Sequence, residues 1–347
     1  MEPSPPPEPP WSTASTPGAF FHRRPSSWRA RNHAQRMVER IYRRPTGTMC
    51  IQGWEGEVMD SAADLAFRLA ADDTKLCERL RFGPRCDPDG PAWVKAGPLT
   101  GSASLRHGLR RLLPWRHAPT IQEYFNLSWL IERHIRTPLP IAAGVLLRHG
   151  LPRYQFMLTV EAVGAVTLAE FLENGPPAER AEVLDELARE TARMHALGFI
   201  HHDLFPRNIL LEPRSTDPAI LVTGERVGTW PGPVGITGAG RRLLFLDAWA
   251  GGPAPQLRGP AYDIACLMLH ADELFTGPEQ ERFFRVYLAE RTVQERPVEP
   301  TALFRDTTRA RRSLVRKLAA RPSRLRGYAL PDPGWKPPPL TTPPSSP

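Results

Sequence analysis

The sequence predicts an α+β protein with a β-rich first half and a mainly helical second half. Two observations carry this prediction. In the first half, residues 91–95 and 154–160 are short apolar runs with the β-branched and aromatic composition of strands. In the second half, residues 179–197 repeat apolar side chains every three to four positions and end at Gly198. That spacing is typical of an amphipathic helix closed by a glycine C-cap.

The remaining elements follow from the same patterns, taken in chain order. Residues 121–135 carry an apolar stripe at helical spacing, and Pro138 and Pro140 end it. A short helix is expected over residues 168–172. After a stretch rich in glycine and proline (213–240), residues 242–247 have the pattern of a buried strand. Further helices are expected over residues 262–274, 283–288 and 302–320.

Proline marks both ends of the chain. Of 40 prolines in 347 residues, seven lie in residues 1–17 and eight in residues 331–347, a composition typical of disorder. Residues 22–44 hold eight arginines and one acid, which predicts a solvated basic arm or a contact with an anionic surface. We therefore expect a disordered arm (1–49), an N-terminal lobe (50–162), a C-terminal lobe (163–325) and a disordered tail (326–347).

The chain is basic, with a formal net charge of +8, so anionic partners are favoured over cationic ones. No run of about 18 apolar residues predicts a membrane-spanning helix, and the first residues lack the pattern of a signal peptide. The four cysteines have no CxxC spacing, which favours free thiols in the cytoplasm over a zinc site or a disulfide framework. Nucleic-acid binding is not expected, because aromatic residues do not alternate with the basic ones.

The segment 201–211, HHDLFPRNILL, carries the residues best suited to catalysis. Asp203 is followed five positions later by Asn208, and an apolar strand closes the segment. In phosphoryl transfer, a carboxylate orients the acceptor hydroxyl and takes its proton, while an amide oxygen helps hold the metal on the phosphates. Asp203 and Asn208 are candidates for these roles. The alternative is a plain turn with its usual acid and asparagine.

Three other charged residues complete the candidate site. Asp247 ends an apolar strand, where a metal ligand facing the β- and γ-phosphates is expected. Lys95, on an early strand, is suited to the α- and β-phosphates, and Glu123 on the following helix is suited to pair with it. Lys95 could instead be an ordinary exposed lysine on a strand. Its partner could instead be Glu132, which lies on the same helix as Glu123.

HHDLFPRNILL resembles the catalytic loop of the protein-kinase-like superfamily, with His202 in place of the usual arginine. WVK at 93–95 resembles the strand that carries the nucleotide-binding lysine, FLDAW at 245–249 stands in the place of D-F-G, and YDIA at 262–265 resembles the helix that supports the loop. The resemblance spans residues 75–290. It implies a bilobal protein-kinase-like fold with a small β-rich N-lobe and a larger helical C-lobe. No G-x-G-x-x-G precedes Lys95, and residues 83–90 have the pattern of a hairpin turn.

Within that superfamily, the chain most resembles the lipopolysaccharide core kinases, the Kdo/heptose kinase family. The motifs that carry this are WVK, an Arg-rich stretch before QEY at 122–124, PLPIAAG at 138–144, LTVE at 158–161 and RGPAYDIA at 258–265. The resemblance implies an ATP- and Mg²⁺-dependent kinase acting on a sugar hydroxyl of an anionic glycolipid, at the inner face of the cytoplasmic membrane. It implies that Lys95 and Glu123 serve nucleotide binding, that Asn208 and Asp247 hold the metal and that Asp203 is catalytic.

Few residues separate Asp247 from Asp263, and no A-P-E segment lies between them, so a platform for a peptide acceptor has little room. This favours a glycolipid or another small acceptor. Two alternatives stay open. One is a kinase that acts on protein or on another small molecule. The other is a pseudokinase scaffold, which the missing glycine-rich loop favours. The basic helix expected at 302–320 is predicted either to present a solvated face or to contact anionic headgroups.

Overall fold

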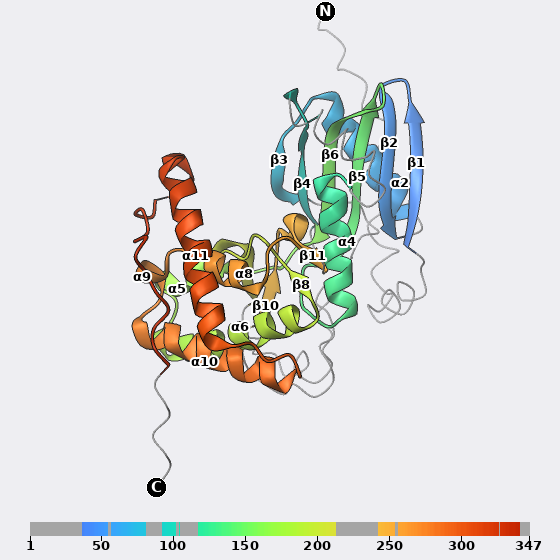
Figure 1. The fold of residues 1–347 in the computed structure, drawn as a ribbon. Coiled ribbons are helices and arrows are strands. Elements are labelled where there is room, and N and C mark those ends of the chain that lie inside the picture. Colours follow the sequence, from blue (N-terminus) through green and yellow to red (C-terminus); the bar gives the residue numbers. More distant parts are fainter. Residues whose placement is uncertain are drawn as a thin grey trace, which may run out of the picture.

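A computed structural model describes residues 37–54, 57–80, 92–101, 104, 117–212, 242–253, 256–325 and 327–340. The expected turn at 83–90, the Arg-rich stretch before residue 117, the segment 213–240 and most of the N-terminal arm lie outside the described residues. Within them, the α+β fold class is confirmed: a sheet dominates the N-terminal part and helices dominate the C-terminal part (Figure 1).

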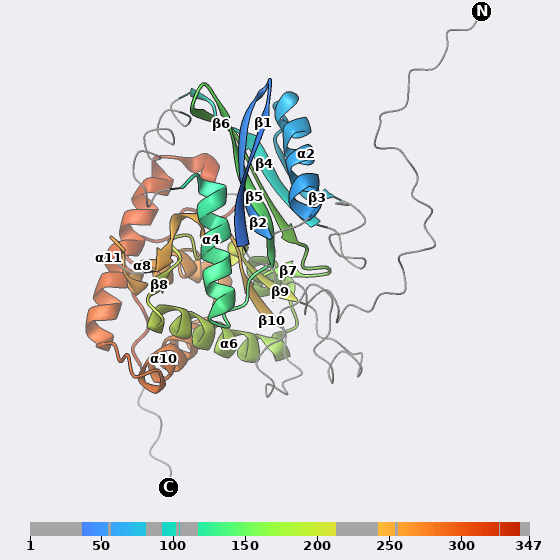
Figure 2. The same ribbon diagram turned by 90° about the vertical axis from the view of Figure 1, so that its right-hand side faces the viewer.

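The N-terminal lobe is a six-stranded antiparallel sheet in the order β1-β2-β5-β6-β4-β3. Two helices cover its opposite faces, α2 (Glu57–Ala71) and α4 (Pro119–Glu132) (Figure 2). A sheet covered on both faces buries apolar side chains on each, which gives the lobe two hydrophobic layers. The strands are β1 (Met37–Arg44), β2 (Gly47–Trp54), β3 (Leu76–Leu80), β4 (Ala92–Pro98), β5 (Pro140–Arg148) and β6 (Leu151–Val160).

The alternation of side chains along β4 decides where Lys95 points. Ala92, Val94 and Ala96 are buried in the layer that includes the apolar face of α2. Successive side chains of a strand point to opposite faces of the sheet. Lys95 therefore lies on the face covered by α4, where its Cα partner on β6 is Met157, a residue of the other hydrophobic layer.

Strand β1 corrects the expected boundary of the N-terminal arm. Residues 37–44 were expected in a disordered segment, but they pair with β2 along their whole length. The positive charge of this strand is matched by acids on α2. Arg40 and Tyr42 both bond to Asp60, and Arg44 contacts Asp64 one helical turn later. The prediction was wrong because these neutralising partners lie in a different part of the sequence.

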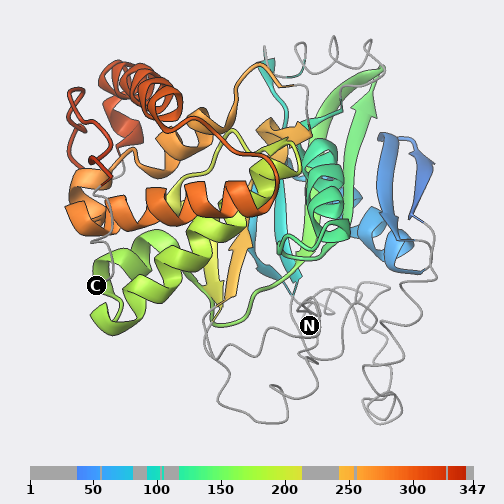
Figure 3. The same cartoon turned by 60° about the horizontal axis from the view of Figure 1, so that its bottom comes forward.

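The C-terminal lobe is mainly helical, and α6 (Pro177–Ala196) is one of the two 20-residue helices in its described part. Helix α10 (Gly277–Val293) lies alongside α6 (Figure 3), and α11 (Pro300–Ala319) packs on α8 (Pro260–Leu267). The helix expected at 262–274 is divided into α8 and α9 (Ala271–Leu274), whereas the helices expected at 168–172, 179–197, 283–288 and 302–320 are present. The first of these four is α5 (Leu168–Asn174). No helix among the described residues has the length and apolar character needed to cross a membrane.

Short strands between the helices frame the segment of the candidate site. β9 (Ile209–Glu212) pairs with β7 (Val166–Thr167) and with β10 (Arg242–Phe245), and β8 (Phe199–Ile200) pairs with β11 (Gly252–Pro253). Segment 201–208, ending in the 3₁₀ turn η1 (Pro206–Asn208), runs between β8 and β9. A second 3₁₀ turn, η2 (Ala248–Ala250), runs between β10 and β11. The two loops therefore start and end on shared strand pairs, which holds them side by side.

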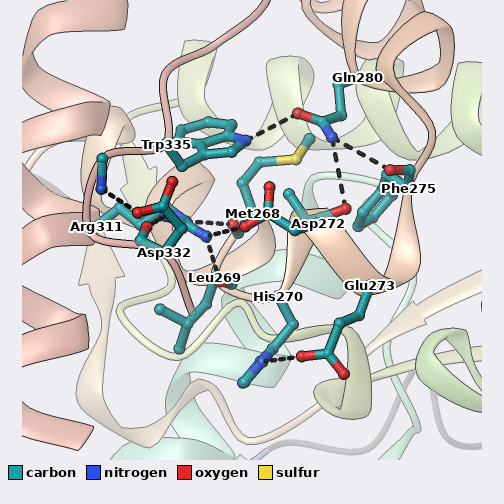
Figure 4. A network of polar contacts seen from close by, with 12 residues as sticks. Met268, Leu269, His270, Asp272, Glu273, Phe275, Gln280, Arg311, Asp332 and Trp335 are labelled. Carbon is teal, nitrogen blue, oxygen red and sulfur yellow. Dashed lines mark hydrogen bonds and ion pairs between the residues drawn. The ribbon is translucent and has the colours of Figure 1, made fainter. Parts of the chain in front are cut away.

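The end of the chain corrects a second expectation, because residues 327–340 pack on the C-terminal lobe instead of forming part of a disordered tail. Trp335 is buried and donates to Gln280 at 3.0 Å, close to the fully buried Arg311 (Figure 4). Arg311 bonds to the carbonyl oxygens of Met268, Leu269 and Asp332. Proline favours extended backbone, and here an aromatic side chain anchors that backbone. A last 3₁₀ turn, η3 (Pro322–Arg324), precedes this segment.

Candidate active site

Lys95, Glu123 and Asp247 meet on the face of the sheet covered by α4. The Lys95 ammonium donates to Glu123 Oε2 at 3.0 Å and also contacts Asp247 Oδ1. The three residues come from β4, from α4 and from the turn after β10, so both lobes contribute to the cluster. The pairing of Lys95 with Glu123 expected from the sequence is present. Glu132, the alternative partner, instead contacts its neighbour Arg133.

Burial and charge act against each other in this cluster. Burial lowers the pKa of Lys95, but the carboxylates of Glu123 and Asp247 outweigh it and raise the pKa above its usual range. The Glu123 side chain is only 7% exposed, and burial raises the pKa of its carboxyl despite the nearby ammonium. The Lys95 ammonium therefore stays charged at neutral pH. Fixed positive charge of this kind suits the binding of phosphate oxygens.

Asp203 and Asn208 form the second cluster, at the end of the loop that follows β8. Asn208 Nδ2 donates to the backbone oxygen of Asp203 at 2.8 Å and to its carboxylate at 3.0 Å. Burial raises the pKa of Asp203, whereas Arg207, 3.9 Å from its carboxylate, lowers it. The Asn208 amide therefore holds Asp203 in one orientation, and the carboxyl becomes a better proton acceptor than an exposed aspartate.

The two clusters belong to one site. The charges of Asp247 and Lys95 both act on the pKa of Asp203, Asp247 raising it and Lys95 lowering it. The backbone N–H of Leu246 also donates to the oxygen of Asn208 at 2.8 Å, which ties the residue before Asp247 to segment 201–208. The structure thus brings together all five residues that the sequence singled out.

Asp263, on α8, supports segment 201–208 through its side chain. Its carboxylate is fully buried and accepts from the backbone N–H groups of His201, at 2.6 Å, and His202, at 2.7 Å. The ring of His195 lies 3.2 Å from the same carboxylate. Burial raises the pKa of Asp263, but these bonds outweigh it and the net pKa is lowered. His202 needs such support because its backbone is left-handed, with φ of 64°, which costs energy in a residue other than glycine.

The turn that carries Asp247 is held on two sides. Asp247 is also left-handed, with φ of 58°, and a Cβ atom at Gly251 would lie 2.1 Å from the backbone oxygen of Ile200. His202 Nδ1 is 2.9 Å from the oxygen of Ala250. On the opposite side, Asn126 of α4 donates to the turn. Sequence reasoning missed Asn126, because a single asparagine within an apolar helix matches no motif.

The oxygen donors of the site suit a magnesium ion bound to a nucleotide. Mg²⁺ prefers oxygen ligands and is usually held by one or two protein side chains together with phosphate oxygens. Asp247 offers a carboxylate. The amide nitrogen of Asn208 is committed to Asp203, which leaves its Oδ1 as the atom able to face a cation. Lys95 supplies the fixed positive charge for the phosphates, so the residues present fit the group.

Comparison with known proteins gives one family match. Residues 105–222 match the model of the lipopolysaccharide kinase (Kdo/WaaP) family, a range that contains Glu123, Asp203 and Asn208. No curated protein matches the chain.

The solved structures that are similar to this chain include the following two. A structure described as WaaP in complex with acyl carrier protein is 18% identical, with a TM-score of 0.43, covering 82% of this chain and 91% of that one. A glucosamine kinase (crystal form B) is 12% identical, with a TM-score of 0.42, covering 82% and 89%. The family match confirms the resemblance drawn from the motifs: the chain is a kinase-type phosphotransferase whose residues 105–222 match the lipopolysaccharide kinase (Kdo/WaaP) family.

Proposed function

We propose that the protein transfers the γ-phosphoryl group of ATP to a sugar hydroxyl of a lipopolysaccharide-core-like glycolipid. The observation that carries the proposal is the single site formed by two clusters: Asp203, oriented by Asn208, beside Lys95 with its partners Glu123 and Asp247. One carboxylate is positioned for an acceptor, and a lysine and a second carboxylate are positioned for a nucleotide and its metal.

Each residue has a separate part in this reaction. Magnesium-bound ATP, when present, supplies the phosphoryl group and neutralises charge on its oxygens. The Lys95 ammonium, oriented by Glu123, donates to the α- and β-phosphates. Asp247 and the Oδ1 of Asn208 hold the cation. Asp203 orients the acceptor hydroxyl and takes its proton as the acceptor oxygen bonds to the γ-phosphorus. The bond from that phosphorus to the bridging oxygen of the β-phosphate breaks at the same time, and ADP leaves. Positioning and charge neutralisation account for most of the rate enhancement.

The lobes proposed from the sequence suit this arrangement. We place the boundary between them near residues 162–163, shortly after β6 ends at Val160. By analogy with the superfamily, the adenine ring lies against this connection. The N-lobe then contributes Lys95 and Glu123, and the C-lobe contributes Asp203, Asn208 and Asp247.

The nature of the acceptor rests on the short connection between the turn of Asp247 and α8. Gly251 alone separates η2 from strand β11, and α8 begins at Pro260. Such a connection offers little surface for an extended peptide, which supports a glycolipid or sugar hydroxyl as acceptor. A kinase for protein or another small molecule is the alternative, and a pseudokinase is the third reading. The complete set of five site residues supports an active enzyme over a scaffold.

A peripheral position at the inner face of the cytoplasmic membrane is part of the proposal. Helix α11 exposes Arg305, Arg309, Arg312 and Arg316, spaced so that they share one face of the helix. Asp306 neutralises the first two in part. A stripe of arginines on a surface helix attracts anionic headgroups, with about 1 kcal/mol for each basic residue near the membrane.

The test follows labelled phosphate. The full-length protein is incubated with γ-labelled ATP, Mg²⁺ and a lipopolysaccharide-core glycolipid, and the label is traced to the glycolipid, protein and free-phosphate fractions. The control variants are Asp203→Ala and, as an exposed aspartate outside the site, Asp306→Ala. We expect label in the glycolipid with the wild type and with Asp306→Ala but not with Asp203→Ala. Label on protein alone would contradict the proposed glycolipid acceptor. A protein that binds no nucleotide would contradict the proposed kinase activity.

A further inference from the structure

Asn126 joins the two lobes through a buried side chain. It lies on α4, is 2% exposed, and its Nδ2 donates to the backbone oxygens of Gly251 at 2.9 Å and Ala248 at 2.5 Å. Its Oδ1 accepts from Gln122 Nε2 at 3.0 Å. All polar atoms of this amide side chain therefore have partners, and both donor bonds go to one turn of the other lobe.

That turn carries Asp247. Ala248 follows it directly, and η2 and Gly251 complete the reversal of the chain before β11. The left-handed backbone of Asp247 is a conformation that an aspartate keeps only when its surroundings impose it. The two bonds from Asn126 fix the backbone oxygens of Ala248 and Gly251, which follow Asp247 in the chain. They are therefore placed to hold the Asp247 carboxylate in a single position.

Asn126 and Glu123 are three residues apart on the same helix, so they lie on neighbouring positions of one face. Glu123 reaches Lys95, and Asn126 reaches the turn of Asp247. Helix α4 thus contacts the nucleotide-binding lysine and the turn of the metal-binding aspartate with two adjacent side chains. A shift of α4 would release both contacts together.

We propose that Asn126 is a positioning residue that fixes Asp247 relative to Lys95 by holding the carbonyl oxygens of Ala248 and Gly251. This role rests on the proposed kinase function. The Asn126 side chain suits this role because it is buried and its polar atoms all have partners. Losing those partners would leave a buried amide unbonded, which costs free energy.

The test compares Asn126→Leu, similar in size but without donors, with Ser128→Ala, which removes a buried hydroxyl from the same helix and leaves both bonds to the turn. The first readout is hydrogen exchange of the backbone amides of residues 247–252, which requires no activity. The others are ATP affinity with and without Mg²⁺ and kcat. Asn126→Ala is a second variant, to be used if the Asn126→Leu protein does not fold.

With Asn126→Leu we expect amide exchange in residues 247–252 to be at least about tenfold faster, because two anchoring bonds are lost. We also expect a smaller gain in ATP affinity on adding Mg²⁺ and a kcat lowered about 10²-fold, as for other small misplacements of catalytic groups. Ser128→Ala should behave as wild type.

Unchanged amide exchange in Asn126→Leu overturns the proposal, and so does faster exchange with unchanged kcat and Mg²⁺ dependence. If the wild type neither binds nucleotide nor transfers phosphate, the proposed function fails, and the positioning role with it. Exchange that still responds to Asn126 would then identify the bond pair as purely structural.

Discussion

The ammonium of Lys95 lies 3.0 Å from the carboxylate of Glu123, and the same ammonium contacts Asp247 from the other lobe. One cation therefore faces two carboxylates, one of them almost fully buried. The charge of Lys95 therefore offsets part of the negative charge of these two carboxylates.

Replacing Lys95 tests this charge compensation. In Lys95→Met the two carboxylates lose their shared cation, and the phosphates lose a fixed positive charge. We expect kcat/KM to fall by about 10²–10³-fold, the loss typical of a preorganised charge-stabilising group. Glu123→Gln keeps a hydrogen-bond acceptor for the ammonium and should cost less. Steady-state kinetics on both variants decides this, and a Lys95→Met enzyme within a few fold of wild type would contradict the assigned role.

The pH dependence reports the environment of Asp203. Because burial raises its pKa, the carboxyl becomes protonated at a higher pH than an exposed aspartate. Protonation removes the proton acceptor, so kcat/KM should fall as the pH falls, with the midpoint above the usual value of about 3.9. Arg207 lowers this pKa, so Arg207→Gln should move the midpoint to higher pH.

The profile is measured as kcat/KM against pH, in the range where the melting temperature of each variant is constant. A midpoint at or below the ordinary aspartate value would contradict the account. A midpoint that moves to lower pH in Arg207→Gln would do the same.

The support from Asp263 can be measured as stability. Asp263→Ala leaves the backbone N–H groups of His201 and His202 buried without their acceptor. We expect the free energy of unfolding to fall by about 3 kcal/mol, as when one partner of a buried pair is removed. Urea denaturation measures it. Asp306→Ala, which removes an exposed ion pair, should change stability by less than about 1 kcal/mol. Equal effects from the two substitutions would contradict a special role for Asp263.

The last residues of the chain should contribute to folding. Trp335→Ala removes a buried side chain that lies over Arg311 and bonds to Gln280, and a loss of about 3 kcal/mol is expected for a buried tryptophan. Trp93→Ala is the control, because Trp93 is 40% exposed. The melting temperatures of the two variants give the comparison. A Trp335→Ala protein as stable as the Trp93→Ala protein would show that residues 327–340 do not stabilise the lobe.

Much of the fold could be predicted because its elements have strong local patterns. The spacing of apolar residues in α6 and α11 and the glycine after α6 are visible in the sequence. Strand β1 was missed because its arginines are neutralised by Asp60 and Asp64, which lie on a helix that follows it. The packing of Trp335 was missed because a proline-rich segment has no periodicity to show which side chain is anchored.

Some residues of the candidate site could likewise be predicted from local sequence patterns, whereas others needed the fold. Asp203 and Asn208 follow from a motif with fixed spacing, and Asp247 and Lys95 follow from strand patterns. Glu123 needed the fold to distinguish it from Glu132, since both lie on the same helix. Asn126 could not be predicted, because the carbonyl oxygens that its amide reaches belong to a turn far along the chain.

The central claim is that Asp203 acts on the acceptor while Asp247 holds the metal and its nucleotide. It is tested most directly by measuring ATP affinity, with and without Mg²⁺, and the rate of phosphoryl transfer in Asp203→Asn and Asp247→Asn. We predict that Asp203→Asn binds ATP with Mg²⁺ as the wild type does but transfers at least about 10²-fold more slowly, whereas Asp247→Asn loses the gain in affinity that Mg²⁺ gives. An Asp203→Asn enzyme that transfers phosphate within a few fold of the wild-type rate would contradict the claim.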